Sequence, residues 1–384
     1  MQRTIQKKLF SNLAVLCSTL LLLFLAGEVF ARFYFSKSIA TNESLKIYQN
    51  STSVTWEHKP DANATHGPGD PPPEIHINNY GMRGPNITLE KPANTRRILL
   101  LGDSFTFGMI VDQEKIFSHL LEKKLNDELT PLTGKNYGVL NFGTIGYTTD
   151  QQYLQLQEKG LQFKPDIVVV NFFAGNDPSE FRRHELEVDE NGELKKVIDV
   201  LHFVDENGEL RRRGVGKPNL YFIALIRERG KVLLNRLGME LQQPRLLWSN
   251  FLPPDHSAGD PDIFTYFQKA EQMLLAIKNL NEQNGIQTLV TIIPADFQVN
   301  SKYLSKYPGN PANAPGFEMT RPQNLIGEFN ASNNIPTLDL LPIFQKDEND
   351  IYFTQNDPHF SEYGHEKMAE ILFKTMYDIL GPAS

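Results

Sequence analysis

The sequence predicts an α/β fold, a three-layer sandwich in which helices cover both faces of a parallel sheet of about five strands. From residue 96 onward, short apolar runs of strand length alternate with segments whose apolar residues recur at helical spacing. The 384 residues are 40% hydrophobic and 22% charged, a composition that supports a sizeable core. An N-terminal transmembrane helix and an insertion of hairpins and a helix are expected in addition.

Each predicted element rests on a local pattern of apolar residues. In chain order, strands are expected at 98–101, 137–142, 165–173, 288–293 and 335–341. Helices are expected at 113–129, 150–161, 264–281, 321–330 and 361–379, where apolar residues lie three or four positions apart. The third strand is apolar along most of its length, which favours a position covered on both faces of the sheet.

The N-terminal segment predicts a membrane anchor. Residues 9–27 form a run of about 19 mostly apolar residues, the length that spans a bilayer. The basic residues before it favour a cytoplasmic tail at 1–8 and a single-pass protein of the cell (inner) membrane, with the remainder periplasmic or extracytoplasmic. A cleaved signal peptide and a buried globular helix are the alternatives.

Beyond the anchor, residues 28–95 are expected as a juxtamembrane linker and lid, and 96–384 as the α/β domain. The stretch 59–73 is rich in Pro, Gly, Asp and Asn and predicts a loop. Arg83 lies in a turn between two glycines. It is interpreted either as a ligand for an anionic substrate group or as a solvated surface arginine.

The insertion at about 177–261 contains a near-repeat. Val-Asp-Glu-Asn-Gly-Glu-Leu occurs at 188–194 and again at 204–210. Because Asn-Gly is a strong signal for a two-residue hairpin turn, two β-hairpins are expected. A basic amphipathic helix is expected at 221–237, with its basic face either solvated or against an anionic lipid surface.

Composition also excludes some classes of protein. The net charge of -8 argues against general nucleic-acid binding. Cys17 is the single cysteine of the sequence, so a disulfide within the chain is impossible. No Cys/His spacing typical of zinc and no phosphate-binding loop is present, so neither a metal nor a cofactor is expected.

The first strand breaks at Gly102-Asp103-Ser104 and leads into a helical pattern. Open α/β folds bind ligands at the carboxyl edge of the sheet, so the Ser104 hydroxyl is expected to project into a crevice there. Backbone N–H groups at the following helix start lie nearby. The alternative is that Asp103 and Ser104 are ordinary turn and capping residues.

Three further segments end at the same predicted edge. Gly146 follows the second strand, Asn176 follows the third, and Asp357-Pro-His359 precedes the last helix. In this arrangement His359 can take the Ser104 proton and Asp357 can orient the imidazole. The backbone N–H groups of Ser104 and Gly146 and the Asn176 amide would stabilise an oxyanion. Taken singly, each residue is equally typical of turns and caps.

As a set, these segments resemble the SGNH hydrolases, also called the GDSL esterase/lipase family. The resemblance covers about residue 96 to the C-terminus apart from the insertion. It implies a flavodoxin-like sheet and metal-free hydrolysis or transfer of ester-linked acyl groups. It also implies Ser104, Asp357 and His359 as the triad, with Gly146 and Asn176 in the oxyanion hole.

The chain departs from the common family pattern in one place. Two residues usually separate the acid from the histidine, whereas Pro358 alone separates them here. A related branch that resembles polysaccharide O-acetyltransferases also has this short spacing. Three alternatives follow for the acid of the triad. It is Asp357, it is another group such as Asp350, or the site works as a Ser–His pair without an acid.

The sequence thus predicts a membrane-anchored serine esterase that acts outside the cytoplasm on a lipid, a small acyl ester or an acylated glycan. An O-acyltransferase, in which a sugar hydroxyl replaces water, is the alternative enzyme. A non-catalytic scaffold that binds envelope glycan is the alternative from another class. No oligomeric state is predicted.

Overall fold

The computed structural model describes residues 2–40, 45–67, 71–213, 222–223, 226, 246–256, 259–307, 315–354 and 357–381. The chain divides into two compact units. One comprises Met1–Glu43 and Gly214–Gln242, and the other, here called the α/β unit, comprises Ser44–Arg213 and Gln243–Ser384.

The predicted parallel sheet is confirmed. Its strands are β5 (Thr95–Gly102), β6 (Asn136–Asn141), β7 (Ile167–Phe173), β12 (Gln287–Ile293) and β13 (Thr337–Asp339), in the spatial order β13-β12-β7-β5-β6. Every pairing between neighbours in this sheet is parallel. This is the flavodoxin-like order, whose topological switch point lies beside the first strand of the sheet, here β5.

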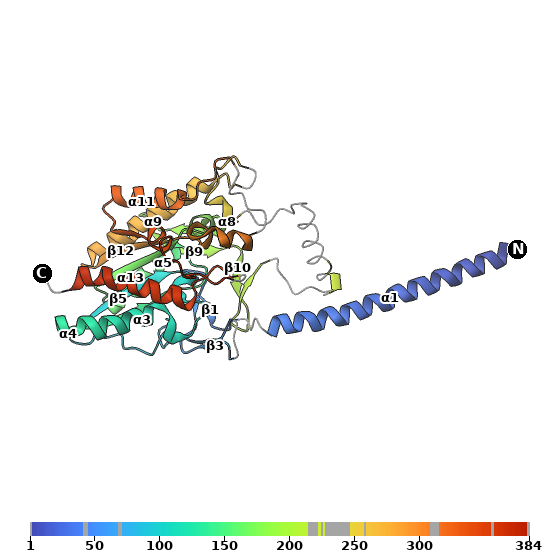
Figure 1. The fold of residues 1–384 in the computed structure, drawn as a ribbon, viewed down its shortest axis with the longest axis horizontal. Helices are drawn as coiled ribbons and strands as arrows, with labels where there is room; N and C mark the ends of the chain where they lie inside the picture. The colour runs from blue at the N-terminus through green and yellow to red at the C-terminus, as the bar shows by residue number, and fades with distance from the viewer. Residues whose placement is uncertain are drawn as a thin grey trace. The chain divides into compact units, whose positions relative to one another are not determined.

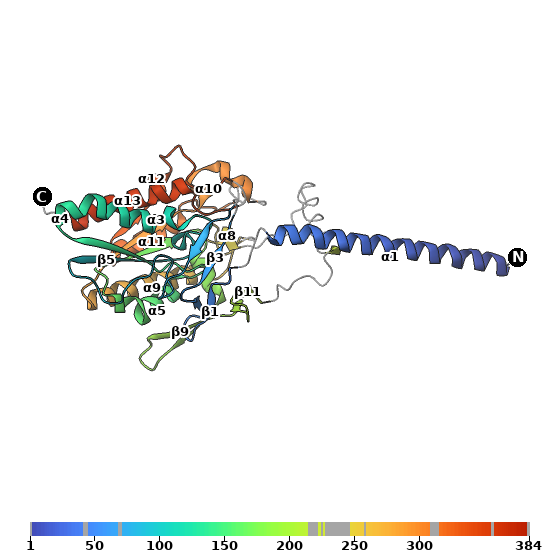
Figure 2. The same ribbon diagram turned by 90° about the horizontal axis from the view of Figure 1, so that it is seen from below.

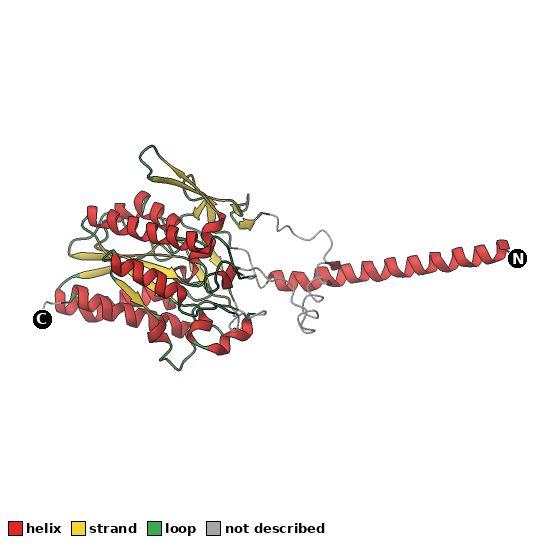
Figure 3. Cartoon of the chain, turned by 90° about the horizontal axis from the view of Figure 1, so that it is seen from above, coloured by secondary structure: helices red, strands yellow, loops and turns green. Residues whose placement is uncertain are grey.

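Helices cover both faces of this sheet (Figures 1 and 3). One face carries α3 (Phe117–Lys124) and α13 (Glu362–Leu380), and the other carries α5 (Thr149–Glu158), α9 (Ile263–Gln283) and α11 (Arg321–Ser332). Successive side chains of a strand point to opposite faces. Accordingly, Ile98 and Leu100 join the core beneath α3 and α13, while Leu99 and Leu101 join the core beneath the other three helices.

The remaining short helices connect these layers. They are α2 (Ser104–Phe107), η1 (Gln113–Lys115), η2 (Leu125–Leu129), α4 (Thr130–Thr133), η3 (Gly160–Phe163), α6 (Asp177–Glu180), η4 (Phe181–Arg183), α8 (Leu246–Ser249), α10 (Asp296–Val299), η5 (Ser301–Lys306) and α12 (Leu341–Phe344).

The single helix predicted at 113–129 is wrong. Ile116 adopts an extended conformation between η1 and α3, and a π-helical turn, η2, follows α3. Ile116 is fully buried, and the Phe117 N–H donates a hydrogen bond to Nδ1 of the buried His365 at 3.2 Å. Tertiary packing therefore overrides the helical periodicity of this segment.

The segment predicted as linker and lid packs into the α/β unit from residue 45 onward. It forms two antiparallel pairs, β1 (Tyr48–Asn50) with β2 (Trp56–His58) and β3 (Asn63–Thr65) with β4 (Glu74–His76). The predicted loop at 59–73 is thus wrong where β3 lies. Trp56 and Ile75 are buried in a cluster that also contains Phe107 and Leu154 of the α/β fold.

The two predicted hairpins of the insertion are confirmed. They pair β8 (His184–Val188) with β9 (Leu194–Asp199) and β10 (His202–Val204) with β11 (Leu210–Arg212), and the first of them projects from the body of the unit (Figure 2). Their turns are longer than the expected two residues. Asp189 and Asp205 each accept backbone N–H bonds within their turn, and Gly192 and Gly208 adopt φ of 81° and 78°.

The other unit contains helix α1 (Gln2–Ala40). Among its described residues, the apolar window Val15–Arg32 has a mean hydropathy of 1.8 and is long enough to cross a membrane. This window overlaps the predicted span at 9–27. Within it, Glu28 pairs with Arg32 at 2.9 Å and accepts a hydrogen bond from the Phe222 N–H at 2.8 Å. Most of the basic helix predicted at 221–237 lies outside the described residues.

Candidate active site

A tight turn places Ser104 at the carboxyl edge of the sheet. β5 ends at Gly102, Asp103 is the N-cap of α2, and Ser104 is the first residue of that helix. The Asp103 Oδ1 accepts a hydrogen bond from the Phe105 N–H at 2.9 Å, so Asp103 does have the capping role given as an alternative. A Cβ on Gly102 would lie 2.1 Å from Thr106 Oγ1, which explains why only glycine fits this turn.

His359 links Ser104 to Asp357. Its Nε2 lies 2.8 Å from Ser104 Oγ, and its Nδ1 lies 2.7 Å from Asp357 Oδ1. The imidazole packs on the ring of Phe105 with a centroid separation of 5.0 Å. The side chains of His359 and Asp357 are 15% and 30% exposed, so the site is open to solvent on the acid side.

The short Asp-x-His spacing is compatible with this contact. Asp357 Oδ1 also accepts a hydrogen bond from the backbone N–H of His359 at 2.8 Å. A carboxylate that binds the N–H two residues further on forms an Asx-turn, and Pro358 restricts the backbone between them. The alternative acid, Asp350, forms an ion pair with Lys302 and lies 3.2 Å from the Tyr303 hydroxyl.

The two predicted oxyanion loops flank Ser104. Because β6 and β7 are the neighbours of β5, Gly146 and Asn176 extend from the strands on either side of the strand that carries Ser104. Gly146 adopts φ of 77°, and Asn176 is the N-cap of α6. No hydrogen bond between described residues uses the N–H of Ser104, the N–H of Gly146 or the Asn176 side-chain NH₂.

The Gly146 loop is also packed against the helix that begins at Ser104. A Cβ on Gly143 would lie 2.3 Å from the backbone nitrogen of Phe107. Asn141 Nδ2 donates to the carbonyl oxygen of Thr106 at 2.8 Å. This close approach fixes the start of the loop beside α2.

Two buried carboxyl groups lie near the turn that carries Ser104. Asp103 and Asp177 are fully buried, and each has one carboxyl oxygen without a hydrogen-bond partner among the described residues. Burial raises the pKa of both groups, and the charge of Asp103 raises the pKa of Asp177 further. Glu180 acts in the same direction on Asp177, whereas Arg183 opposes it. The protonated form of the Asp177 carboxyl is therefore favoured.

We expect Asp177→Asn to raise the unfolding temperature at pH 8 by about 2 °C or more, the shift that roughly 1 kcal/mol produces in a domain of this size. Below the unfolded aspartate pKa of about 3.9, both states of wild type are protonated. Above it, the unfolded chain loses the proton first, so wild-type stability falls as pH rises toward the folded pKa. The amide oxygen can still accept the Phe173 N–H bond that Asp177 makes at 2.9 Å.

Thermal unfolding of the full-length protein in detergent at pH 5 and pH 8 measures this effect. The gain of the variant over wild type should be larger at pH 8. Asp127→Asn is the matched control, because that carboxylate is 58% exposed and pairs with Lys123 on the surface. An Asp177→Asn variant that is less stable than wild type at pH 8 would show that the charged form is favoured.

Both interpretations of Arg83 are wrong. Arg83 is 2% exposed, and it donates hydrogen bonds to the carbonyl oxygens of Phe107, Gly108 and Val111. Burial lowers the pKa of its guanidinium to about 9. The buried arginine therefore stabilises the C-terminal end of α2 through these hydrogen bonds. Its side chain is available neither to solvent nor to a substrate.

Two buried side chains of the insertion were missed by the sequence analysis. Arg183 donates a hydrogen bond to the Gly146 carbonyl oxygen, and Asn250 donates to those of Ala174 and Gly175. Their sequence surroundings carry no motif. Among the described residues, no group of three or more His, Cys, Asp or Glu side chains is arranged to hold a metal ion.

The chain matches the GDSL-like Lipase/Acylhydrolase family over residues 100–367. The chain belongs to this family. It is therefore an enzyme that hydrolyses ester bonds, and the predicted resemblance is confirmed at the level of the family.

Three similar solved structures have low sequence identity to the chain. TesA is 14% identical with a TM-score of 0.39, over 74% of this chain and 100% of that one. A lipase/acylhydrolase from Enterococcus faecalis is 16% identical with a TM-score of 0.40, over 75% and 99%. The acetyl xylan esterase AlAXEase is 16% identical with a TM-score of 0.38, over 73% and 98%. None of the curated proteins compared with the chain matches it.

Proposed function

We propose that the chain is a serine acylhydrolase whose catalytic triad is Ser104, His359 and Asp357. The observation that carries this proposal is the continuous contact from Ser104 Oγ through His359 to Asp357, at 2.8 and 2.7 Å. A serine hydroxyl becomes nucleophilic when an adjacent base accepts its proton. The imidazole is held in the orientation for this step by the carboxylate on its other side.

The reaction has two halves. In the first, Ser104 Oγ bonds to the acyl carbon while its proton passes to His359 Nε2, and the alcohol leaves with that proton. In the second, His359 takes a proton from water, the hydroxide oxygen bonds to the acyl carbon, and Ser104 recovers its proton as the acid is released. Both halves pass through a tetrahedral oxyanion.

The oxyanion is assigned three donors: the N–H groups of Ser104 and Gly146 and the side-chain amide of Asn176. These donors extend from β5, β6 and β7, which lie side by side in the sheet. They make no other hydrogen bond among the described residues, so they remain available to a substrate oxygen. Losing one such donor typically costs about 10²–10³ in rate.

The enzyme is further proposed to be anchored by α1 with its α/β unit outside the cytoplasm. The apolar window Val15–Arg32 supports the anchor, and Arg3, Lys7 and Lys8 before it support an internal N-terminus. The same triad would serve transfer of an acyl group to a sugar hydroxyl. Adding a glycan acceptor distinguishes hydrolysis from transfer. If acyl-glycan forms faster than free acid, the enzyme is an acyltransferase and not a hydrolase.

Labelling with a fluorophosphonate, which reacts with activated serines, tests the proposal in membranes that contain the full-length protein. Wild type should be labelled and Ser104→Ala should not. Ser301→Ala, at an exposed serine of η5, is the control and should be labelled like wild type. A membrane-impermeant probe should label intact cells if the α/β unit is outside the cytoplasm. A folded wild type that stays unlabelled would instead support the scaffold hypothesis.

A further inference from the structure

A buried arginine of the insertion holds the Gly146 turn. Arg183 is 6% exposed, and one of its terminal nitrogens donates a hydrogen bond to the Gly146 carbonyl oxygen. The rest of the guanidinium is held by ion pairs at 2.6 Å with Glu180 and with Asp199. A planar guanidinium fixed on two sides presents its remaining donor in one direction. The Gly146 carbonyl is therefore bound by a rigid group.

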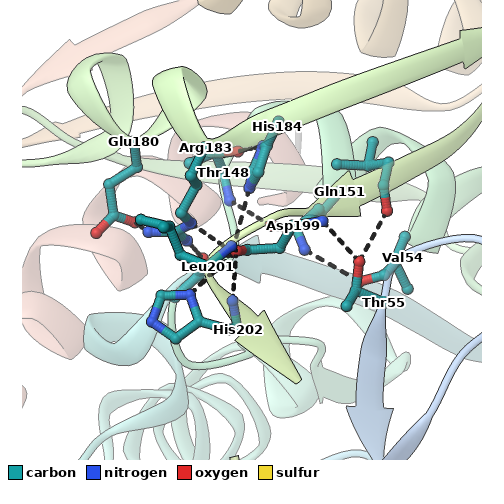
Figure 4. Close-up of polar contacts among 12 residues, drawn as sticks. Val54, Thr55, Thr148, Gln151, Glu180, Arg183, His184, Asp199, Leu201 and His202 are labelled. Atoms are coloured by element: carbon teal, nitrogen blue, oxygen red, sulfur yellow. Dashed lines mark hydrogen bonds and ion pairs between the residues drawn. The ribbon is translucent and has the colours of Figure 1, made fainter. Parts of the chain in front are cut away.

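Asp199 is itself fixed from several sides, between Arg183, His184 and His202 (Figure 4). Its Oδ1 accepts two backbone N–H bonds at 2.8 Å, and its Oδ2 lies 3.0 Å from His202 Nδ1. His184 Nε2 is 3.7 Å from the same oxygen, and His184 Nδ1 is 2.8 Å from Asp150. Acidic and basic side chains alternate through this chain, so displacing one member would leave its buried neighbours without their partners at a large cost.

An asparagine of the same insertion holds the loop that carries Asn176. Asn250 follows α8 and is fully buried. Its Nδ2 donates hydrogen bonds to the carbonyl oxygens of Ala174 at 3.2 Å and Gly175 at 3.0 Å. These two residues directly precede Asn176 in the chain. The amide therefore fixes the backbone from which the Asn176 side chain extends.

We infer that Arg183 and Asn250 are positioning residues, each of which aims one of the proposed oxyanion donors by holding the backbone of its loop. This inference rests on the proposed function. Gly146 is glycine at φ of 77°, and an added Cβ would meet nothing closer than 3.6 Å. Such a residue rotates at low cost. Oxyanion stabilisation requires donors that are aimed before the reaction, and the insertion supplies that constraint to both loops.

The test compares Arg183→Lys and Asn250→Ala with wild type in the full-length protein. Lysine keeps a positive charge that can pair with Asp199 and Glu180. It lacks the planar guanidinium that also donates a hydrogen bond to the Gly146 carbonyl oxygen. We expect kcat for an activated ester to fall about 10-fold in each variant, because misplacing a reacting group by about 1 Å costs up to roughly 10² in rate. KM should change by less than about 2-fold, as expected when an interaction acts only in the transition state.

A trifluoromethyl ketone gives a readout that a merely structural role would not change. Ser104 Oγ adds to the ketone carbon, the proton passes to His359, and the new oxyanion occupies the three donors. Its inhibition constant should rise in both variants by the same factor as kcat/KM falls, since the adduct resembles the transition state. Arg182→Lys is the matched control, because that neighbouring guanidinium is exposed in the same 3₁₀ turn, and it should match wild type.

Two results would overturn the inference while leaving the proposed function intact. In the first, Arg183→Lys and Asn250→Ala both keep the kcat and the ketone affinity of wild type while Ser104→Ala is inactive. The other is a rise in KM with kcat and ketone affinity unchanged. Failure of the proposed function looks different, because Ser104→Ala would then hydrolyse the ester as fast as wild type.

Discussion

Replacing His359 by alanine in the full-length protein is expected to lower kcat for an activated ester by about 10³-fold, within the range that general acid–base groups contribute. The imidazole nitrogen that contacts Ser104 Oγ at 2.8 Å is the only base in the proposed cycle. Without it, the serine proton has no acceptor in the first half-reaction and water has none in the second. Steady-state kinetics on purified, detergent-solubilised protein measure the loss.

Free imidazole should restore part of the activity of His359→Ala. The side chain is 15% exposed and packs on Phe105, so its removal leaves a partly open site beside an aromatic face. His76→Ala is the control, because His76 lies on β4 with its Nδ1 2.7 Å from Asn63, and its kcat should match wild type. A folded His359→Ala protein that retains more than about a tenth of wild-type kcat would contradict the assignment of this base.

The strands of the sheet were predictable because their apolar pattern is local. Residues 98–101 of β5 and all of β7 are buried, so each segment is a nearly unbroken apolar run in the sequence. The break at Ile116 was not predictable in the same way. The break depends on His365, which accepts a hydrogen bond from the Phe117 N–H and lies 248 positions further along the chain. The sequence around Ile116 has helical periodicity, and only packing against the last helix overrides it.

The same distinction applies to the site. Ser104 and His359 could be predicted as candidate site residues because each lies in a short motif at a strand end or helix start, and the structure places their side chains in contact. Arg183 and Asn250 could not, because an arginine among charged residues and an asparagine in a loop have no local signature. Their proposed roles depend on contacts with carbonyl groups 37 and 75 residues away, at Gly146 and Gly175.

Arg83 shows how sequence context alone can mislead. A polar residue between two glycines in a turn is typical of the surface, and both interpretations assumed an accessible guanidinium. The hairpins around it instead fold onto α2, and the arginine satisfies backbone carbonyls that the turn after α2 leaves unpaired. Burial of a long cation is tolerated there because several acceptors replace the lost water.

Asp357→Asn is expected to lower kcat by about 10²-fold, less than the roughly 10⁴ lost when a fully buried triad acid is replaced. Asp357 Oδ1 accepts both the backbone N–H and the Nδ1–H of His359, at 2.8 and 2.7 Å. An amide oxygen can keep an acceptor position but carries no charge to stabilise the imidazolium. The acid is 30% exposed, so water already screens part of its charge and the loss is smaller.

Comparison with Asp350→Asn decides which carboxylate acts on His359. Asp350 pairs with Lys302 and contacts the Tyr303 hydroxyl at 3.2 Å, so its replacement should change kcat by less than about 3-fold, as expected for a surface ion pair. The opposite pattern, with Asp350→Asn inactive and Asp357→Asn active, would assign the acid to Asp350. If both variants match wild type while His359→Ala is inactive, the site works as a Ser–His pair, and the Asp357 contact serves only to form the turn before α13.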